Sequence, residues 1–307
     1  MRLSCREGRP LNITKYQTFL KVVELGSLTR AAEALGYTQS GVSHTINSLE
    51  EELGFTLLIR SRAGVQLTPD GARVLPAVRS ILNGVNQLEQ IVAAIRGLDT
   101  GEIRVGAFTS VAVHWLPGMI KTFQRDYPRI EFKLLNGDYH DVERWLQDGS
   151  IDVGFVALPA RIECRAIPLR EDRLLAILPK DHPKAKLDRF PLSDIEGEDF
   201  ISLLKNSDQD ARRAMELAGV KPHIKFTTKD DYAIIAMVEN GLGISIAPEL
   251  LLRGHTDNLR AMELFPTAKR TIALAWPEAS ALSPAVQAFV DHAVKWVKAD
   301  SMEQPGN

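Results

Sequence analysis

The chain contains little cysteine, which excludes several classes of protein. Its 307 residues include two cysteines, Cys5 and Cys164, too few for a disulfide framework and without the spacing of a metal site. Only Cys164 lies in the C-terminal two thirds, so a redox-sensing disulfide within that part lacks its second thiol. We expect Cys164 to be an inert cysteine beside a strand.

The sequence also lacks long apolar runs and catalytic motifs. No stretch approaches the roughly 18 apolar residues that a membrane span requires, and no signal peptide is recognisable, so we expect a cytoplasmic protein without membrane contact. The seven histidines are scattered without metal-ligand spacing, and neither a Gly-x-Ser-x-Gly motif nor a phosphate-binding loop occurs. These absences argue against an enzyme, a metal site and a cofactor.

Positive charge does not exceed negative charge overall, but it is unevenly distributed. The formal net charge is -2, and 45% hydrophobic content over this length supports two or three domains with separate cores. Through Gly97 the chain has 11 lysines and arginines against 8 acidic residues, whereas the remainder has 26 against 31. The N-terminal third is therefore modestly basic, which fits a nucleic-acid partner.

Residues 27–53 predict two short helices separated by a tight turn. Ser27 and Thr38 are placed to cap the two helices, and Gly36 supplies a left-handed stop between them. The expected inward positions are Ala31, Ala32, Leu35, Val42, Ile46, Leu49 and Leu53. Such a unit delivers its second helix to the DNA major groove. The alternative is an ordinary helical hairpin with a solvated polar face.

The outward face of the second helix is polar over its first two turns, where a recognition helix reaches base edges and phosphates. It carries Gln39, Ser40, Ser43, His44 and Asn47. Residues 56–60 and 65–68 then flank a turn and predict a small hairpin with Arg60 and Arg62 near its tip. Such a wing places cations on the phosphate backbone.

A long amphipathic helix is expected from about Pro69 to Arg96, opened by Thr68 as cap and Pro69 at the first helical position. Its apolar residues step by three and four, which favours pairing with the same helix of a second chain over packing on the chain's own domains. This seam consists of Leu75, Val78, Leu82, Val85, Leu88, Val92 and Ile95. Pro76 is expected to kink the helix or to leave one carbonyl unbonded.

From Gly101 onward, strand-like and helix-like segments alternate, which predicts an α/β fold with helices on both faces of a sheet. The expected strands are residues 103–108, 130–135, 152–158, 174–178, 200–203, 223–227, 244–247 and 271–276. The expected helices include residues 116–126, 141–147, 210–217, 231–240 and 284–298.

Several short motifs follow one another in a specific order. They are Ser-Leu-Thr-x-Ala-Ala from Ser27, Thr-Gln-x-x-Val-Ser from Thr38, Leu-Glu-x-x-Leu-Gly from Leu49, Leu-Thr-x-x-Gly from Leu67, Gly-Glu-Ile-Arg-Val-Gly from Gly101, Leu-x-x-Gly-x-Ile-Asp from Leu146 and Val-x-x-Gly-Leu-Gly-Ile-x-x-x-Pro from Val238. Each motif is weak alone. Their joint order resembles the LysR-type transcriptional regulators over nearly the whole chain.

The resemblance implies a mixed fold in three parts. Residues 1–68 would form an all-α winged helix-turn-helix domain, and residues 69–100 a linker and dimerisation helix with a hinge. Residues 101–307 would form an effector-binding domain of two α/β subdomains similar to the type 2 periplasmic binding protein fold. The first subdomain would comprise about 101–168 with 269–307, and the second about 169–268.

The resemblance also implies a function. The protein would be a sequence-specific transcriptional regulator, a homodimer or a homotetramer made of two dimers. It would bind double-stranded DNA with an interrupted dyad, contact RNA polymerase and respond to a small-molecule effector. A stand-alone solute-binding protein is disfavoured by the DNA-binding unit and the missing export signal. A ligand-independent architectural DNA-binding protein stays open.

Carried over by position, Gln39, Ser43 and His44 match recognition-helix positions, and Arg60 and Arg62 match the wing. The full set expected to contact DNA is Thr29, Arg30, Gln39, Ser40, Ser43, His44, Asn47, Arg60 and Arg62. Ser40 stands where many members have proline and His44 where many have arginine. A bidentate arginine contact to guanine is therefore not available at position 44, and the preferred sequence should differ. The first dozen residues precede the usual start of the family and are either a basic arm or the product of a misplaced start codon.

Candidate effector residues follow from where strands end, because ligands of open α/β sheets lie beyond the carboxyl ends of strands, near helix N-termini. They are Phe108, Thr109, Ser110, Asp138, Tyr139, Ser202 and Asp230. The resemblance places Ser110 and Ser202 at effector-contacting positions. Helix capping is the alternative role of Ser110, Asp138 and Asp230. Asp138 would repel a carboxylate and favour a cationic or polyhydroxyl ligand.

Overall fold

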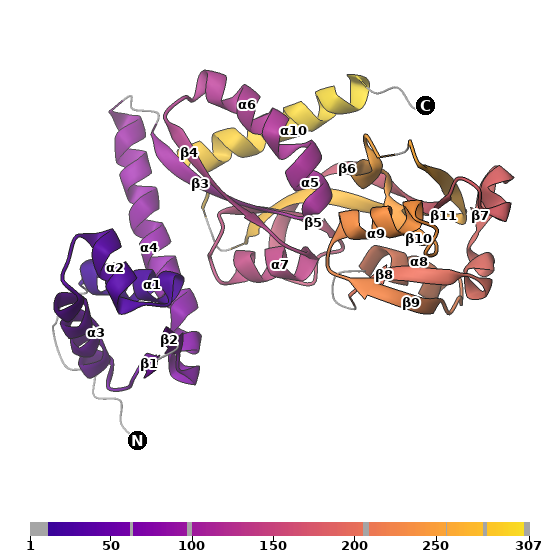
Figure 1. Ribbon diagram of the computed structural model, residues 1–307. Helices are drawn as coiled ribbons and strands as arrows, with labels where there is room; N and C mark the ends of the chain where they lie inside the picture. The colour runs from indigo at the N-terminus through magenta and orange to yellow at the C-terminus, as the bar shows by residue number, and fades with distance from the viewer. Residues whose placement is uncertain are drawn as a thin grey trace. The chain divides into compact units, whose positions relative to one another are not determined.

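The computed structural model describes residues 12–61, 64–96, 100–204, 209–255, 257–278 and 281–303. The chain divides into two compact units, Met1–Glu89 and Gln90–Asn307. The first runs from indigo into purple in Figure 1, and the second continues to the yellow C-terminal helix. Each unit has its own hydrophobic core.

Three helices form the body of the first unit: α1 (Ile13–Leu25), α2 (Leu28–Leu35) and α3 (Gln39–Leu53). The predicted caps are present, since Ser27 Oγ accepts from the Arg30 N–H and Thr38 Oγ1 from the Gly41 N–H. Gly36 ends α2 with a φ of 70°, a left-handed conformation that costs glycine little. The buried inward residues are Ala31, Ala32, Val42, Ile46 and Leu49.

A two-stranded hairpin completes this body. Strands β1 (Leu58–Ser61) and β2 (Gly64–Leu67) pair antiparallel, as the sequence predicts. The Glu50 carboxylate of α3 accepts hydrogen bonds from the Leu57 and Leu58 N–H groups at 2.6 and 3.1 Å, which ties the hairpin to α3. Arg62 lies outside the described residues, so its expected place near the tip stays a prediction.

Helix α4 (Pro69–Ile95) is continuous and includes Pro76. Its predicted seam divides into two halves. Leu75, Val78 and Leu82 are buried in the core of their own unit. Leu88, Val92 and Ile95 are exposed by 61%, 39% and 81%. The expectation that the whole seam pairs with a second chain is therefore wrong for the first half, because those side chains already pack within the first unit.

The second unit is built on a seven-stranded sheet in the order β10-β6-β11-β5-β3-β4, with β7 pairing β11 (Figure 1). A separate two-stranded sheet pairs β8 with β9. The strands are β3 (Gly101–Ala107), β4 (Ile130–Asn136), β5 (Val153–Leu158), β6 (Cys164–Pro179), β7 (Arg189–Pro191), β8 (Asp199–Leu203), β9 (His223–Thr228), β10 (Ser245–Pro248) and β11 (Leu259–Pro277).

Strands β6 and β11 are much longer than the sequence predicts. They pair antiparallel from Cys164 opposite Pro277 to Pro179 opposite Leu259, and so connect the two α/β subdomains. The apolar pattern predicts only residues 174–178 and 271–276, because charged residues precede each of them, whereas the family resemblance implies crossing strands near residues 165–170 and 265–275, which lie within β6 and β11. Among these charged residues, Asp172 and Arg270 are direct partners across the ladder.

Helices cover both subdomains. They are α5 (Thr109–His114), α6 (Leu116–Asp126), α7 (Tyr139–Gln147), α8 (Gln209–Leu217), α9 (Asp231–Glu239) and α10 (Pro284–Glu303), with short 3₁₀ helices at Pro183–Lys186, Leu192–Gly197 and Glu249–Leu252. Helix α10 returns to pack against α6 in the first subdomain, as expected.

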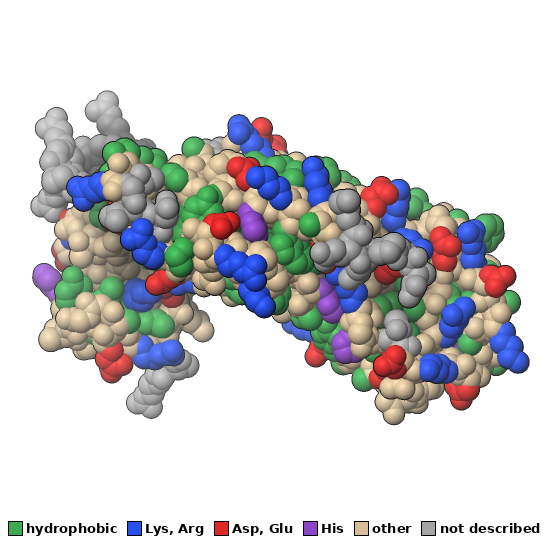
Figure 2. Space-filling model, turned by 90° about the horizontal axis from the view of Figure 1, so that it is seen from above, with side chains coloured by type: hydrophobic (Ala, Val, Ile, Leu, Met, Phe, Trp, Pro, Cys, Tyr) green, Lys and Arg blue, Asp and Glu red, His purple; other side chains and the backbone are tan. Residues whose placement is uncertain are grey.

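Two further observations concern the charges on the surface and the length of the apolar helices. On the face drawn in Figure 2, lysine and arginine side chains are interspersed with aspartate and glutamate. Within the described part of the chain, no helix is both long and apolar enough to span a membrane.

Candidate functional site

The polar face of α3 is accessible. Gln39, Ser40, His44 and Asn47 are exposed, and Ser43 is half-buried. Thr29 and Arg30, in the first turn of α2, are exposed as well. The eight described residues of the expected DNA contact set therefore lie on α2, α3 and the hairpin, where the turn after Gly36 brings α2 and α3 together.

Arg60 joins the hairpin to this face. Its Nη1 donates to Ser43 Oγ at 2.8 Å and its Nη2 to Asn47 Oδ1 at 2.6 Å. The sequence predicted a cation for the phosphate backbone, and the structure adds that this cation orients two side chains of α3. A guanidinium has five N–H groups, so these two bonds leave donors for a phosphate.

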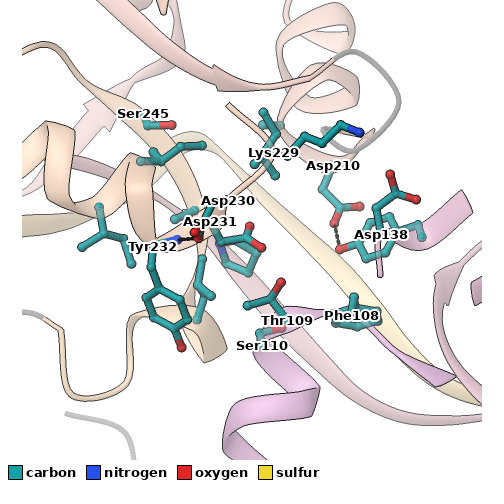
Figure 3. A pocket seen from close by; sticks show the side chains of 18 of the residues that line it. Phe108, Thr109, Ser110, Asp138, Asp210, Lys229, Asp230, Asp231, Tyr232 and Ser245 are labelled. Atoms are coloured by element: carbon teal, nitrogen blue, oxygen red, sulfur yellow. Dashed lines mark hydrogen bonds between the residues drawn. The ribbon is translucent and has the colours of Figure 1, made fainter. Parts of the chain in front are cut away.

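A cavity of about 530 Å³ lies in the second unit, between α5 and α7 on one side and α8, α9 and β10 on the other (Figure 3). This volume suits a small organic molecule. Six of the seven predicted effector residues line it, namely Phe108, Thr109, Ser110, Asp138, Tyr139 and Asp230. Apolar lining comes from Val113, Leu174, Leu203, Ile234, Ile235, Ile246 and Leu251.

Ser202 does not line the cavity. The residue is 3% exposed, and its hydroxyl donates to the Leu203 carbonyl oxygen at 2.9 Å. The expectation that Ser202 faces the ligand is therefore not met by this geometry. Among the described residues of the second subdomain, the serine that lines the cavity is Ser245, on β10.

Arg270 of β11 is the buried centre of the site. Its Nε and Nη2 donate to Asp172 Oδ2 at 2.9 and 2.7 Å, and Nη2 also donates to Ser110 Oγ at 2.8 Å. Nη1 donates to the Tyr139 hydroxyl. The Phe108 ring lies over the guanidinium, 4.9 Å from its carbon, as in a cation–π contact.

The charge of Arg270 is fixed by these partners. Burial alone lowers the pKa of the guanidinium, but Tyr139, Asp172 and Asp210 outweigh burial and raise that pKa above its usual value. Asp172 is itself 2% exposed and also accepts from the Leu250 N–H at 2.9 Å. The buried ion pair is thus hydrogen-bonded on both sides, the condition under which such a pair is tolerated.

Carboxylates surround the rest of the cavity. Asp138 accepts from the Asp141 N–H at the start of α7, and Asp230 from the Tyr232 N–H at the start of α9. Both therefore have the capping role that was the alternative to ligand contact. Asp231 is partly buried, and this burial raises the pKa of its carboxyl, against a hydrogen bond from Thr109 and the charge of Arg270.

Sequence reasoning missed three central residues of this site: Asp172, Asp210 and Arg270. The available signal was a charged residue within two positions of the start of an apolar run, at Asp172 and at Arg270. This signal is ambiguous because three further charged residues flank Asp172. Only the pairing register of β6 against β11 shows that Asp172 lies opposite Arg270.

The chain is similar to known proteins over most of its length. Residues 13–72 match the family model described as bacterial regulatory helix-turn-helix protein, lysR family, and residues 96–298 match the LysR substrate binding domain. YvbU, an uncharacterized HTH-type transcriptional regulator of Bacillus subtilis strain 168, is 33% identical over 286 residues, which cover 92% of this chain and 98% of YvbU.

Solved structures show the same arrangement of the chain. HinK, a LysR family transcriptional regulator from Pseudomonas aeruginosa, aligns with a TM-score of 0.59 at 26% identity, over 94% of this chain and 99% of that one. A full-length OxyR variant from Pseudomonas aeruginosa aligns with a TM-score of 0.77 at 21% identity, over 95% and 96% of the two chains. At 21% identity the likeness concerns the fold alone.

Proposed function

The chain belongs to the LysR family of transcriptional regulators, and we propose that it is a sequence-specific regulator whose action on DNA changes when a small molecule binds in the cavity. Residues 1–68 are assigned to DNA binding, 69–100 to self-association and 101–307 to effector binding. We further propose that the protein acts in the cytoplasm and contacts RNA polymerase there.

The assignment of the DNA contacts rests on the accessible face of α3. Gln39, Ser43 and Asn47 carry hydrogen-bonding groups within the first turns of a helix whose opposite face is buried. Short and planar polar side chains on such a helix read base edges in the major groove. A homodimer would present two of these helices to an interrupted dyad with half-sites about one helical turn, or a multiple, apart.

The cavity is the observation that carries the effector part of the proposal. Its lining comes from both subdomains, so a ligand there touches both and favours one arrangement of them. We assign effector contacts to Phe108, Thr109, Ser110, Asp138, Tyr139 and Asp230. A ligand changes transcription only through different affinities for two arrangements of the assembly. An architectural DNA-binding protein would not respond in this way.

Band-shift titrations on the operator and on a scrambled duplex test the DNA contacts. Gln39→Ala and Ser43→Ala should each reduce discrimination by about 1–3 kcal/mol per lost contact. Arg60→Ala should weaken both duplexes and reduce the salt dependence. Glu51→Ala, exposed on the last turn of α3, is the matched control. Unchanged discrimination in both helix variants would remove α3 from the reading role.

Effector coupling is tested by footprinting on operator DNA, with and without a small molecule that raises the melting temperature of the full chain. The ligand should change the length or affinity of the footprint in the wild type. A ligand that binds but leaves the footprint and transcription unchanged would favour the architectural alternative.

A further inference from the structure

The cavity assigned to the effector is acidic. Among the residues that the structure describes, five aspartates line it, against two cations, Lys229 and Arg270. The aspartates are Asp138, Asp141, Asp210, Asp230 and Asp231. In Figure 3, Asp138 and Asp210 lie on one side of the cavity and Asp230 and Asp231 on the other. A ligand between them therefore meets carboxylates from α7, α8 and α9.

Arg270 does not provide a site for an anion. Four of its five N–H groups donate to Asp172, Tyr139 and Ser110, and Asp172 balances its charge. A ligand carboxylate would have to displace one of these partners within a buried network. Displacement leaves a buried polar group without a hydrogen bond, and the free-energy penalty of that exceeds the stabilisation that one ordinary hydrogen bond gives.

The N-termini of α7 and α9, which would otherwise attract anions, are also occupied, whereas α5, a helix of only six residues, begins at the cavity without a side-chain cap. Asp138 caps α7 and Asp230 caps α9 with hydrogen bonds of 2.9 Å each. A negatively charged cap already interacts with the positive end of the helix dipole. Lys229 and Asp230 are both exposed, so solvent screens both charges, and the less exposed Asp138, Asp141, Asp210 and Asp231 keep the cavity acidic.

Asp231 supplies an independent reason to expect a positively charged ligand. Its carboxyl is partly buried, and burial makes the charged form costly enough to raise its pKa. A positive charge nearby would favour the ionised carboxylate. The neighbouring lining is aliphatic: Ile234 and Ile235 follow on the same helix, and Leu251 belongs to the same hydrophobic cluster. The cavity thus combines a negative polar side with an apolar wall.

From these features we infer that the effector is an organic cation, a protonated amine or guanidinium on a carbon body small enough for about 530 Å³. This inference rests on the proposed function, because it names the ligand class of the cavity to which that function assigns the effector.

Thermal shift and calorimetry on the full chain test the inference with compounds matched in size. The probes are 1,4-diaminobutane against succinate and butane-1,4-diol, and 2-phenylethylamine against phenylacetate. At least one amine should raise the melting temperature, and neither acid should. A missing shift with both amines, or an equal shift with a matched acid, would overturn the inference.

Charge-removing variants locate the binding. Asn caps helices about as well as Asp, so Asp230→Asn with Asp231→Asn removes charge while retaining the cap of α9. The double variant should weaken amine binding about tenfold or more, whereas Asp291→Asn, exposed on α10, should not change it. Unchanged affinity in the double variant contradicts the inference.

The same preparation separates this inference from the proposed function. Operator binding of the wild type without ligand reports on the first unit. If operator binding is intact and amines fail, the ligand class is wrong and the proposed regulator stands. If amines bind but the operator does not, the proposed function fails instead.

Discussion

The Tyr139 hydroxyl donates a hydrogen bond to Asp210 Oδ2 at 2.5 Å, and so joins the start of α7 to the start of α8 across the cavity. The same oxygen accepts from Arg270 Nη1. Burial raises the pKa of Tyr139 well above its usual value, which keeps the phenol protonated and able to donate. One hydroxyl therefore links the two subdomains and the crossing strand β11.

Removing this hydroxyl should destabilise the second unit. Tyr139→Phe leaves Asp210 without its donor and Arg270 without one acceptor, at a cost of about 1–3 kcal/mol. Urea unfolding should show a lower midpoint. Tyr232→Phe is the control in the same cavity, because the Tyr232 hydroxyl is buried and has no hydrogen-bond partner among the described residues. Its loss should be neutral or stabilising, and equal effects of the two changes would contradict the role of Tyr139.

Asp231 should make the second unit less stable as pH rises. A carboxyl whose folded pKa is raised contributes stability that is present below its usual value of 3.8 and is lost as pH rises through the folded pKa. Asp231→Asn should therefore melt at a higher temperature than the wild type at pH 7, and the difference should shrink toward pH 4. Melting curves across this range check the expectation. A difference that grows toward low pH would be the wrong sign.

The two glycines of α4 should respond in opposite ways to alanine. A Cβ at Gly71 would lie 2.2 Å from the Leu57 carbonyl oxygen, so Gly71→Ala forces the hairpin away and should cost about 1–3 kcal/mol. A Cβ at Gly84 meets nothing within 4 Å. Gly84→Ala should stabilise the helix by roughly 0.5–1 kcal/mol. Chemical unfolding of the first unit measures both, and a stabilising Gly71→Ala would refute the close approach.

Self-association should depend on the second half of the α4 seam. Leu88 and Val92 are exposed apolar residues one turn apart, and Leu88→Glu or Val92→Glu should yield folded monomers with weak operator affinity. Leu82→Glu is expected to unfold the first unit instead, because Leu82 is 6% exposed. Light scattering gives the mass, and circular dichroism the folding. If Leu88→Glu and Val92→Glu both keep the wild-type mass of the assembly, the interface lies elsewhere.

Much of the DNA-binding unit could be predicted from the sequence because its determinants are local. The caps at Ser27 and Thr38 and the stop at Gly36 act within one or two helical turns, and each lies where the pattern predicted. The bounds of α6 were predicted without error for the same reason. Candidate effector residues at strand ends were predictable too, since parallel strands bring their carboxyl ends to one edge.

What the sequence by itself determined is therefore the family, the order of the elements and six of the residues that line the cavity. Only the tertiary structure decided which charges neutralise each other, because the Arg270 pair with Asp172 spans 98 positions and depends on the register of β6 against β11. It also decided that Leu75, Val78 and Leu82 face their own core while Leu88 is exposed. An apolar stripe records that a side chain avoids water, and the folded chain alone determines which surface covers it.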